Sequence, residues 1–198
     1  MNENPYPAGF AKVRLPAGQS GEASIERKTL TDADVSLENL RCQMRGQLRR
    51  VTPPGDYTVL KVRGAVMMSD VPSEAREHLG PLWAVKEGAS VLLNGLGLGF
   101  VLAAILRKNP ACVTVIEKDA DVIALVAPHY KDRRVTIVHA DAFDYQPPKG
   151  ARYDVVWHDI WADICGDNLR EMTALKRKYG RRAEWQGCWS ESQLRRAA

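Results

Sequence analysis

The chain has 198 residues, of which 45% are hydrophobic and 26% charged, and its formal net charge at pH 7 is +4. This size suits one ordinary hydrophobic core with an appended N-terminal piece. The longest apolar stretch, 91–106, is interrupted by three glycines and an asparagine, so it lacks the roughly 20 apolar residues of a membrane span. The N-terminus has neither the basic start nor the apolar centre of a secretory signal, and we expect a cytoplasmic protein without a membrane partner.

The cysteines and the basic residues narrow the class further. Cys42, Cys112, Cys165 and Cys188 are widely separated and form no C-x-x-C pair, so we expect reduced thiols, no metal site and no disulfide framework. Basic residues gather within 41–50, 176–182 and 195–196. Such groups are typical of solvated helix faces, although they can also contact phosphate backbones. Nucleic acid is therefore an alternative partner and not the favoured one.

Residues 1–52 are predicted to form a mobile arm and a helix. The first 24 residues or so contain several prolines and glycines and few apolar side chains, which leaves little apolar surface to offset the entropy of ordering. From Thr31, a residue that can cap a helix, apolar residues recur at helical spacing as far as Leu48. This helix is expected to end near Thr52, because the following Pro53–Pro54 cannot continue it.

Residues 53–82 are predicted to form a small antiparallel hairpin and a short helix. The β-type runs 57–62 and 65–68 are joined by Arg63–Gly64, which can supply a tight turn. Ser69 or Asp70 is then expected to cap a helix over 73–79, which Gly80–Pro81 would close.

Residues 83–198 are predicted to form a Rossmann-like α/β domain. Strand-type runs alternate with helices of about ten residues, which indicates a parallel sheet with right-handed crossovers. The expected segments are a strand, turn and helix over 89–106, strands at 112–116, 135–138 and 153–158, helices at 119–129 and 168–179, and a final strand at 183–189. Asp167 is expected to cap the last helix, with Gly180 in the position after it.

The glycine turn between the first strand and helix is the main candidate for ligand binding. Gly95, Gly97 and Gly99 allow a sharp turn and a close backbone approach, and the helix that follows offers its unpaired N–H groups. This geometry suits a nucleotide or nucleoside. Any tight connection can use glycine, so the turn alone is weak support.

Three carboxylates follow the next three predicted strands. In an open parallel sheet, ligands bind at the carboxyl ends of the strands, where Glu117, Asp141 and Asp159 are expected to meet the glycine turn. Glu117 lies 18 positions after Gly99, close to the spacing of a carboxylate that accepts hydrogen bonds from an adenosine ribose. Asp141 is a candidate for the adenine amino group, and Asp159 for orienting or deprotonating an acceptor. Without a role in ligand binding, Glu117 would be a solvated acid at a strand end, Asp141 an ordinary loop acid, and Asp159 a cap of the next segment.

Between Lys61 and Trp161 the chain resembles the spermidine synthase-like branch of the class I S-adenosylmethionine (SAM)-dependent transferases. The similar segments are 62–70, 91–99, 115–119, 134–142 and 153–159. The resemblance implies a Rossmann-like class I methyltransferase sheet, SAM as cofactor and a reactive-site carboxylate at Asp159. The site residues that we expect from the motifs and the resemblance together are Asn94, Gly95, Leu96, Gly97, Gly99, Glu117, Lys118, Asp141, Ala142 and Asp159.

Departures from the branch's pattern bear on the substrate. Leu98 and Ala162 stand where aminopropyltransferases carry acids, and the aromatic residue that contacts polyamines is missing near Pro72–Ser73. A site that lacks carboxylates is poorly suited to polycations, which argues against polyamine synthesis. The residues after Tyr179 suffice for scarcely one of the two further strands of the family sheet, so the sheet is expected to be truncated there. A tail, a helix or a second subunit would then cover the edge, and a homodimer is one expectation.

The leading hypothesis is therefore a SAM-dependent methyltransferase that acts on an unidentified acceptor, with Asp159 as its catalytic residue. The alternatives are an aminopropyltransferase that uses decarboxylated SAM and a non-catalytic protein of the same fold that binds nucleic acid. An NAD(P)-dependent enzyme is less favoured. The loop here reads G-x-G-x-G, and Phe100 stands where the dinucleotide fingerprint G-x-G-x-x-G requires its last glycine.

Overall fold

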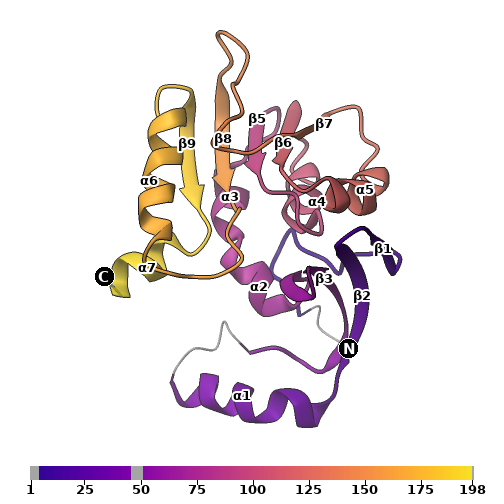
Figure 1. Cartoon of the computed structure of the whole chain (residues 1–198). Coiled ribbons are helices and arrows are strands. Elements are labelled where there is room, and N and C mark those ends of the chain that lie inside the picture. Colours follow the sequence, from indigo (N-terminus) through magenta and orange to yellow (C-terminus); the bar gives the residue numbers. More distant parts are fainter. Residues whose placement is uncertain (1–4, 46–50, 198) are drawn as a thin grey trace.

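The computed structural model describes residues 5–45 and 51–197. Two sheets organise this part of the chain: a four-stranded antiparallel sheet in the order β1-β2-β3-β4 and a five-stranded sheet in the order β7-β6-β5-β8-β9 (Figure 1). All neighbouring strands of the five-stranded sheet are parallel, which confirms the predicted α/β class. No helix within the described ranges is both long and apolar enough to cross a membrane.

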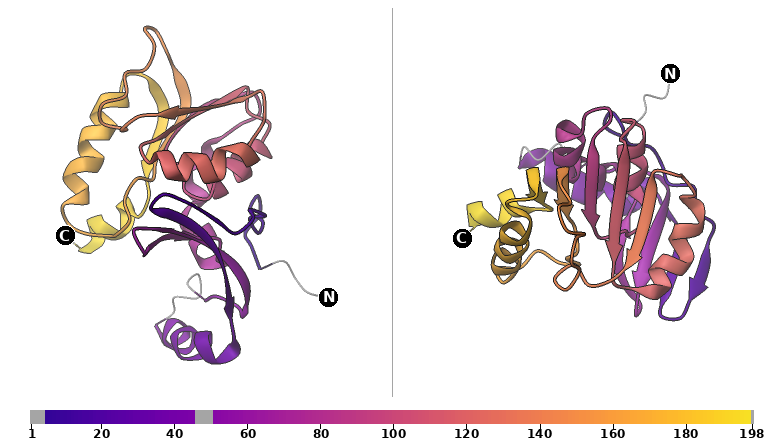
Figure 2. Two further views of the ribbon diagram at one scale, coloured as in Figure 1. Left: turned by 45° about the vertical axis from the view of Figure 1, so that its right-hand side comes forward. Right: turned by 90° about the horizontal axis from the view of Figure 1, so that it is seen from above.

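The N-terminal part contains four strands and three helices in the described ranges. They are β1 (Gly18–Ser20), β2 (Ala23–Leu30), α1 (Asp32–Met44), β3 (Gly55–Val62), β4 (Ala65–Ser69), α2 (Pro72–Glu77) and α3 (Leu79–Ala84). The strands of this sheet lie between α1 and the five-stranded sheet, as the turned view in Figure 2 shows. The N-terminal sheet therefore faces the rest of the molecule and is not a separate appendage.

The C-terminal part alternates strands and helices as predicted. Its elements are β5 (Ser90–Asn94), α4 (Phe100–Leu106), β6 (Cys112–Glu117), α5 (Ala120–Val126), the 3-10 turn η2 (Ala127–His129), β7 (Val135–His139), β8 (Tyr153–His158), α6 (Asn168–Tyr179), β9 (Ala183–Cys188) and α7 (Glu191–Ala197). The strand order, with β5 in the middle and the chain stepping first to one side and then to the other, places a crossover point at the end of β5.

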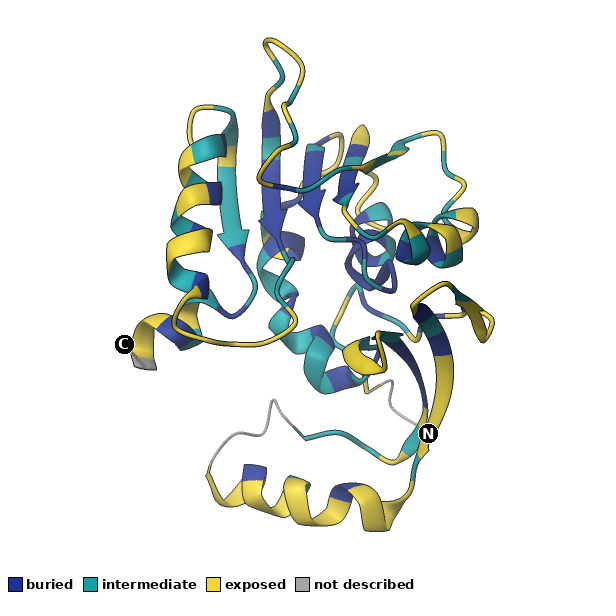
Figure 3. Ribbon diagram, in the orientation of Figure 1, coloured by how far each residue is buried: buried dark blue, intermediate teal, exposed yellow. Residues whose placement is uncertain are grey.

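Alternate residues of the parallel strands build two cores. On one face, side chains such as Val91, Val113 and Val155 pack with α3, α4, α5 and the N-terminal segment. On the other face, Leu92 and Val156 pack with α6. The central strands β5, β6 and β8 are largely buried, whereas the edge strands β7 and β9 are mostly half-buried or exposed (Figure 3). This rigid layer fixes the positions of the strand ends.

The prediction of a mobile arm at the start of the chain is wrong for the residues that the structure describes. Phe10, Val13 and Leu15 are buried in the main core, and β2 pairs with β3 along its whole length. The backbone N–H of Val13 also donates to the buried Asp70 carboxylate. The few apolar residues of this segment thus suffice, because they insert into a core built by the rest of the chain.

The helix predicted from Thr31 is confirmed at its start. Thr31 caps α1 in a reciprocal capping box with Asp34, in which each side chain bonds the other residue's backbone N–H. The helix ends at Met44 rather than near Thr52, and residues 46–50 lie outside the described ranges. Most of α1 is exposed, so it packs on the body through one narrow face (Figure 3).

The hairpin of β3 and β4 is confirmed, whereas the caps predicted for the next helix are wrong. Val71 precedes α2 without a side-chain cap. Asp70 instead accepts hydrogen bonds from the backbone N–H groups of Val13 and Thr58, which ties the N-terminal segment to β3. Gly80–Pro81 does not close the region either, because both residues lie inside α3.

At the C-terminal end, α6 and β9 are confirmed, and α7 was not predicted. Asp167 makes no side-chain cap, and Gly180 has a right-handed φ of −55°, so the predicted capping roles of both residues are wrong. The end of α6 is held instead by a backbone bond from Arg182 to Tyr179. The described part of the parallel sheet has five strands, with β9 at one edge.

Candidate functional site

A cavity of about 790 Å³ lies at the carboxyl ends of β5, β6, β7 and β8. Residues that follow these strands form one wall, and β3, β4 and Glu22 of the β1–β2 turn form the other. Of the predicted site residues, Gly95, Gly97, Glu117, Lys118, Asp141, Ala142 and Asp159 line this cavity. The structure therefore brings most of them together, and it adds the antiparallel sheet as an opposite wall that the sequence did not predict.

The remaining predicted site residues, Asn94, Leu96 and Gly99, do not line the cavity. Asn94 is buried, and its side-chain amide lies 2.7 Å from Nδ1 of the buried His158. Leu96 points into the core, and Gly99 begins α4 in the left-handed conformation. These residues belong to the structure that supports the glycine loop and not to the wall of the cavity.

The glycines of the loop are required by the packing of the protein itself. Gly95, Gly97 and Gly99 have φ values of +104°, +49° and +68°. A Cβ at these positions would overlap the carbonyl oxygen of Asp159, the sulfur of Met68 and the ring of Tyr130, respectively. The packing of the protein therefore gives a local reason for these glycines, and the close approach of a ligand to the loop stays a prediction.

Glu117 is held against the glycine loop. Its Oε2 accepts the backbone N–H of Leu96 at 2.8 Å, and its Oε1 accepts the N–H of Asp119 at 2.9 Å. Each carboxylate oxygen has a second lone pair, so both can still accept a hydroxyl. The carboxylate is thus pre-oriented at the edge of the cavity, where a pair of ribose hydroxyls would find two acceptors.

Asp141 lies in a tight loop after β7 that is tied down by α6. Its Oδ1 accepts the N–H of Phe143 at 2.8 Å. Lys178 of α6 donates from Nζ to the carbonyls of Ala142 and Phe143, at 3.0 and 2.6 Å. The sequence places Lys178 in a basic cluster on a helix surface, and nothing in its spacing indicates a role in holding this loop.

Asp159 follows β8 and is half-buried, and its side chain is 14% exposed. Its backbone N–H donates to the carbonyl of Asn94, which links the ends of β5 and β8. Burial, and then the nearby carboxylates of Glu77 and Glu117, raise the pKa of Asp159 to about 7. A carboxyl group with such a pKa can accept and release a proton near neutral pH.

The imidazole of His78 lies beside Asp159. Its Nδ1 lies 3.5 Å from Oδ2 of Asp159, and the imidazole is buried. Because burial lowers the pKa of His78 to about 4, the ring is neutral at pH 7 and gives Asp159 no full positive charge. The sequence contained no signal for this pairing, since His78 belongs to the turn between α2 and α3.

A second cavity, of about 530 Å³, lies beside the first. Both cavities are lined by Met67, Met68, Asp159 and Trp161. Glu74 and Glu77 of α2 also line the second cavity, although Leu98 and Ala162 carry no carboxylates at the two positions discussed above. Burial raises the pKa of Glu74 to about 8.

The cysteines play no part in the glycine-loop cavity. All four are free thiols; Cys42 and Cys188 are buried, and Cys112 and Cys165 are exposed. Within the ranges that the structure describes, no group of three or more histidine, cysteine or acidic side chains is arranged to hold a metal ion.

Comparisons with known proteins give partial structural similarity only. No protein-family model matches the sequence, and no curated protein is similar to it. A proposed RNA methyltransferase from Pyrococcus horikoshii matches with 17% identity and a TM-score of 0.45, over 63% of this chain and 62% of that one. A SAM-dependent methyltransferase from Mesorhizobium loti matches with 15% identity and a TM-score of 0.38, over 46% of this chain and 42% of that one.

A protein that is not a methyltransferase has a similar identity and TM-score. A proposed zinc-dependent alcohol dehydrogenase from Rhodobacter sphaeroides matches with 23% identity and a TM-score of 0.43, over 53% of this chain and 42% of that one. The chain thus spans less than two thirds of each of these structures. Scores of this size identify neither a family nor an activity, so the functional conclusion depends on the geometry of the site.

Proposed function

We propose that this protein is a SAM-dependent methyltransferase. The observation that carries the proposal is the first cavity, in which the glycine loop and the acids after three successive parallel strands face one space of about 790 Å³. A volume of this size is in the range of small-molecule sites. The acidic lining also suits a cofactor with a sulfonium cation and several hydrogen-bond donors.

The residues present fit this cofactor. Glu117 would accept hydrogen bonds from the ribose hydroxyls, because its two oxygens are already oriented by Leu96 and Asp119. Asp141 would accept from the adenine amino group, beside the buried Ala142, with Lys118 at the rim. When bound, SAM supplies a methyl group on a positively charged sulfur that is activated for displacement.

Asp159 would manage the proton of the acceptor. It lines both cavities and has a pKa near neutrality because of burial. The role of the protein is then to align a nucleophile and to take up its proton, which are contributions of proximity and general base catalysis.

Calorimetric titration with S-adenosylhomocysteine tests the cofactor assignment. We expect binding by the wild-type protein and by Asp159→Asn, because the ribose and adenine contacts do not involve that carboxylate. NADH serves as the competing ligand for a dinucleotide site. Absence of heat with S-adenosylhomocysteine, or preferential binding of NADH, would refute the methyltransferase proposal.

Nucleic acid is a less favoured partner than a small-molecule acceptor. Lys176 and Arg195, which belong to the basic clusters, pair with Glu191, and Lys178 bonds backbone carbonyls. These side chains are partly engaged within the protein, which favours a solvated helix face over a nucleic-acid surface. Salt-dependent binding of DNA or RNA would contradict this interpretation.

A homodimer and a cytoplasmic location stay predictions, and sedimentation of the purified protein tests the first.

A further inference from the structure

Helix α1 carries a stripe of apolar side chains that are open to solvent. Leu37, Leu40 and Met44 are 58%, 53% and 80% exposed, and Ala33, one turn before Leu37, is exposed as well. The four residues follow one another at spacings of four, three and four, so they lie along one side of the helix. Single exposed apolar residues are ordinary, whereas a contiguous apolar stripe generally marks an interaction site.

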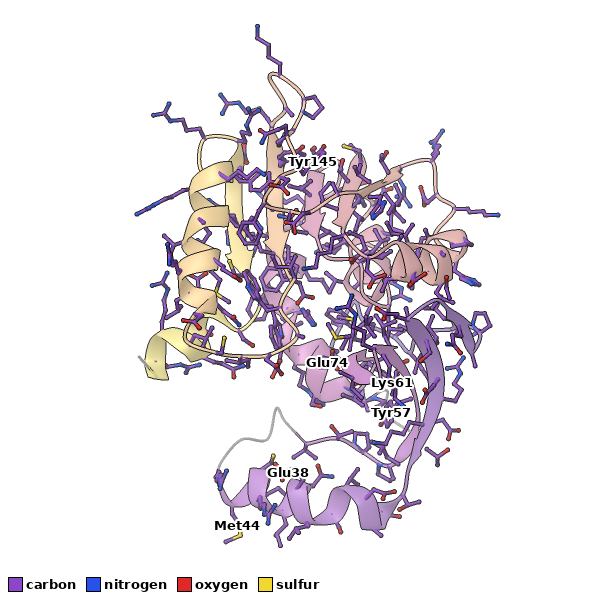
Figure 4. The ribbon with its side chains drawn as sticks, in the orientation of Figure 1. Glu38, Met44, Tyr57, Lys61, Glu74 and Tyr145 are labelled. Carbon is purple, nitrogen blue, oxygen red and sulfur yellow. The ribbon has the colours of Figure 1, made fainter. Side chains whose placement is uncertain are left out.

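The opposite side of α1 attaches the helix to the body of the protein. Val35 and Cys42 are buried there, and the side-chain amide of Asn39 exchanges two hydrogen bonds with the backbone of Thr52, at 2.7 and 2.9 Å. At about 100° per residue, these three positions and the exposed stripe lie about 160° apart around the helix axis. Figure 4 shows Met44 on the side of the helix away from the body. The stripe therefore cannot pack on the body while this attachment holds.

The spacing of the stripe is that of a coiled-coil seam. When Leu37 and Met44 are counted as a positions, Ala33 and Leu40 are the d positions of the same heptads. In an antiparallel pair of helices, a residues of one helix pack against d residues of the other. A second copy of α1 would thus set Leu37 against Leu40 and the long Met44 against the small Ala33. The stripe is complementary to itself, as a twofold interface requires.

The charges that flank the stripe favour an antiparallel partner. Asp34 and Arg41 occupy the two e positions, with the acid in the first half of the helix and the base in the second. Antiparallel pairing brings e positions together, so each Asp34 would meet Arg41 of the other copy. Parallel pairing would set e against g, and the g positions, Ser36 and Gln43, are uncharged. The antiparallel arrangement also places the two helix dipoles in opposite directions.

A lipid surface is a poorer partner for the same stripe. Helices that lie on membranes carry lysine and arginine on their polar side, which attract anionic lipids. Within α1, the three acids Asp32, Asp34 and Glu38 outnumber Arg41. An anionic membrane would therefore repel this helix, whereas a second copy offers both an apolar seam and opposite charges.

We propose that the apolar stripe of α1 is the contact surface between two copies of this protein, which pair through antiparallel α1 helices. The twofold axis crosses the seam between Leu37 and Leu40. The proposal is independent of the proposed function, because the lining of the first cavity includes no residue of α1. Glu38 and Cys42 of α1 line the second cavity, so the dimer also steadies one wall of that cavity.

Sedimentation of the full chain over a range of concentrations tests the contact. Because two short helices bury less than the roughly 1,200 Å² of a stable interface, we expect a dissociation constant of about 50 µM. Leu40→Glu places a charge in the centre of the seam and should leave a monomer at about 500 µM, tenfold above that constant. Val66→Glu is the control, because Val66 is 59% exposed but lies on β4, and it should dimerise like the wild type.

Two results of this experiment would overturn the proposal. One is a wild-type protein that stays monomeric at the highest concentration, and the other is a dimer that Leu40→Glu leaves intact. Circular dichroism and urea denaturation show that Leu40→Glu is folded, as expected for a change at a half-exposed position on the outer side of a helix.

Exchange of the flanking charges tests the antiparallel arrangement. Arg41→Glu sets an acid against Asp34 of the other copy, and Asp34→Lys sets a base against Arg41. Each change turns two attractive contacts into repulsive ones, so each variant should associate with itself about tenfold more weakly than the wild type. In an equal mixture of the two variants, the acids of one chain meet the bases of the other, and association should return to about the wild-type strength.

A mixture that associates no better than either variant alone would overturn the antiparallel pairing. Asp34→Lys also removes half of the capping box with Thr31, so its helix content is compared with that of the wild type by circular dichroism. If α1 frays in that variant, Arg41→Glu decides the question alone, and unchanged self-association of Arg41→Glu overturns the proposal. Cosedimentation with vesicles of phosphatidylcholine and phosphatidylserine tests the lipid alternative. Binding of the wild type to these vesicles, lost in Leu40→Glu, would assign the stripe to a membrane instead.

Discussion

The two cavities that meet at Asp159 are built in different ways. The first takes its polar groups from the ends of successive parallel strands, so the topology of the sheet alone brings Glu117 and Asp141 to one edge. The second takes its acids from α1 and α2, whose positions depend on how helices pack against the body. Strand ends can therefore be predicted from sequence order, whereas a cavity between helices cannot.

The difference also concerns rigidity. The glycine loop beside the first cavity is held by the hydrogen bonds of Leu98 with Met68 and Tyr130. The second cavity is bounded on one side by α1, a helix that is exposed over most of its surface (Figure 3). We expect changes in the first cavity to affect folding and cofactor binding together, and changes in the second to leave cofactor binding unchanged.

The largest expected effect comes from Gly95→Ala. The residue has a φ of +104°, and a Cβ would overlap the carbonyl of Asp159. We expect the free energy of unfolding, measured in urea, to fall by about 4 kcal/mol. Gly150→Ala is the control, because Gly150 has a φ of +82° but open space around it, and should cost about 1–2 kcal/mol. Equal losses would show that the overlap with Asp159 is unimportant.

Glu117→Ala should have the next largest effect. The change removes two hydrogen bonds that orient the loop, together with the acceptor that we propose for the ribose hydroxyls. Because hydrogen bonds to charged groups contribute about 1.5–3 kcal/mol, we expect the affinity for S-adenosylhomocysteine to fall about 30-fold in calorimetry. Glu184→Ala, at an exposed site outside both cavities, should have no effect. An unchanged affinity of Glu117→Ala would mean that the ribose lies elsewhere.

Asp159, which both cavities share, should show a characteristic dependence of stability on pH. Its pKa in the folded protein, about 7, is higher than the ordinary value of 3.8, so folding favours the protonated form. This contribution to stability is complete below pH 3.8 and is lost as the pH rises through 7. Asp159→Asn removes the buried charge and should be about 2 kcal/mol more stable than the wild type at pH 8.5. The difference should disappear near pH 4.

Urea denaturation of both proteins from pH 4 to pH 8.5 measures this effect. Glu74 titrates in the same range, and the Asp159 carboxylate contributes to its raised pKa, so the comparison is repeated in a Glu74→Gln background to isolate Asp159. A variant that is less stable than the wild type at pH 8.5 would show that the carboxylate of Asp159 is stabilised by contacts other than those seen here.

The sequence contained enough information for the parallel sheet and for the acids at its strand ends. The alternating strands and helices after Ser90 indicate a parallel sheet, and Glu117, Asp141 and Asp159 follow three of its strands at the same edge. It did not indicate that residues 5–30 are ordered, because Phe10 and Leu15 are buried by partners distant in the chain. For the same reason the sequence does not indicate that the acids of α2 share a cavity with Asp159. Their chemistry arises only when α2 packs beside Asp159.

Lys178 provides the smallest and most specific test of how the first cavity is held. Its ammonium bonds the carbonyls of Ala142 and Phe143, and burial lowers its pKa. Lys178→Met keeps much of the apolar stem and removes these bonds, so the loop that carries Asp141 should become less ordered. We expect about a threefold loss of affinity for S-adenosylhomocysteine, since part of the ordering is transferred to the binding step. Lys149→Met, in the exposed loop before β8, is the control. If both variants bind alike, α6 contributes nothing to the adenine side, and the strand ends alone hold the cofactor.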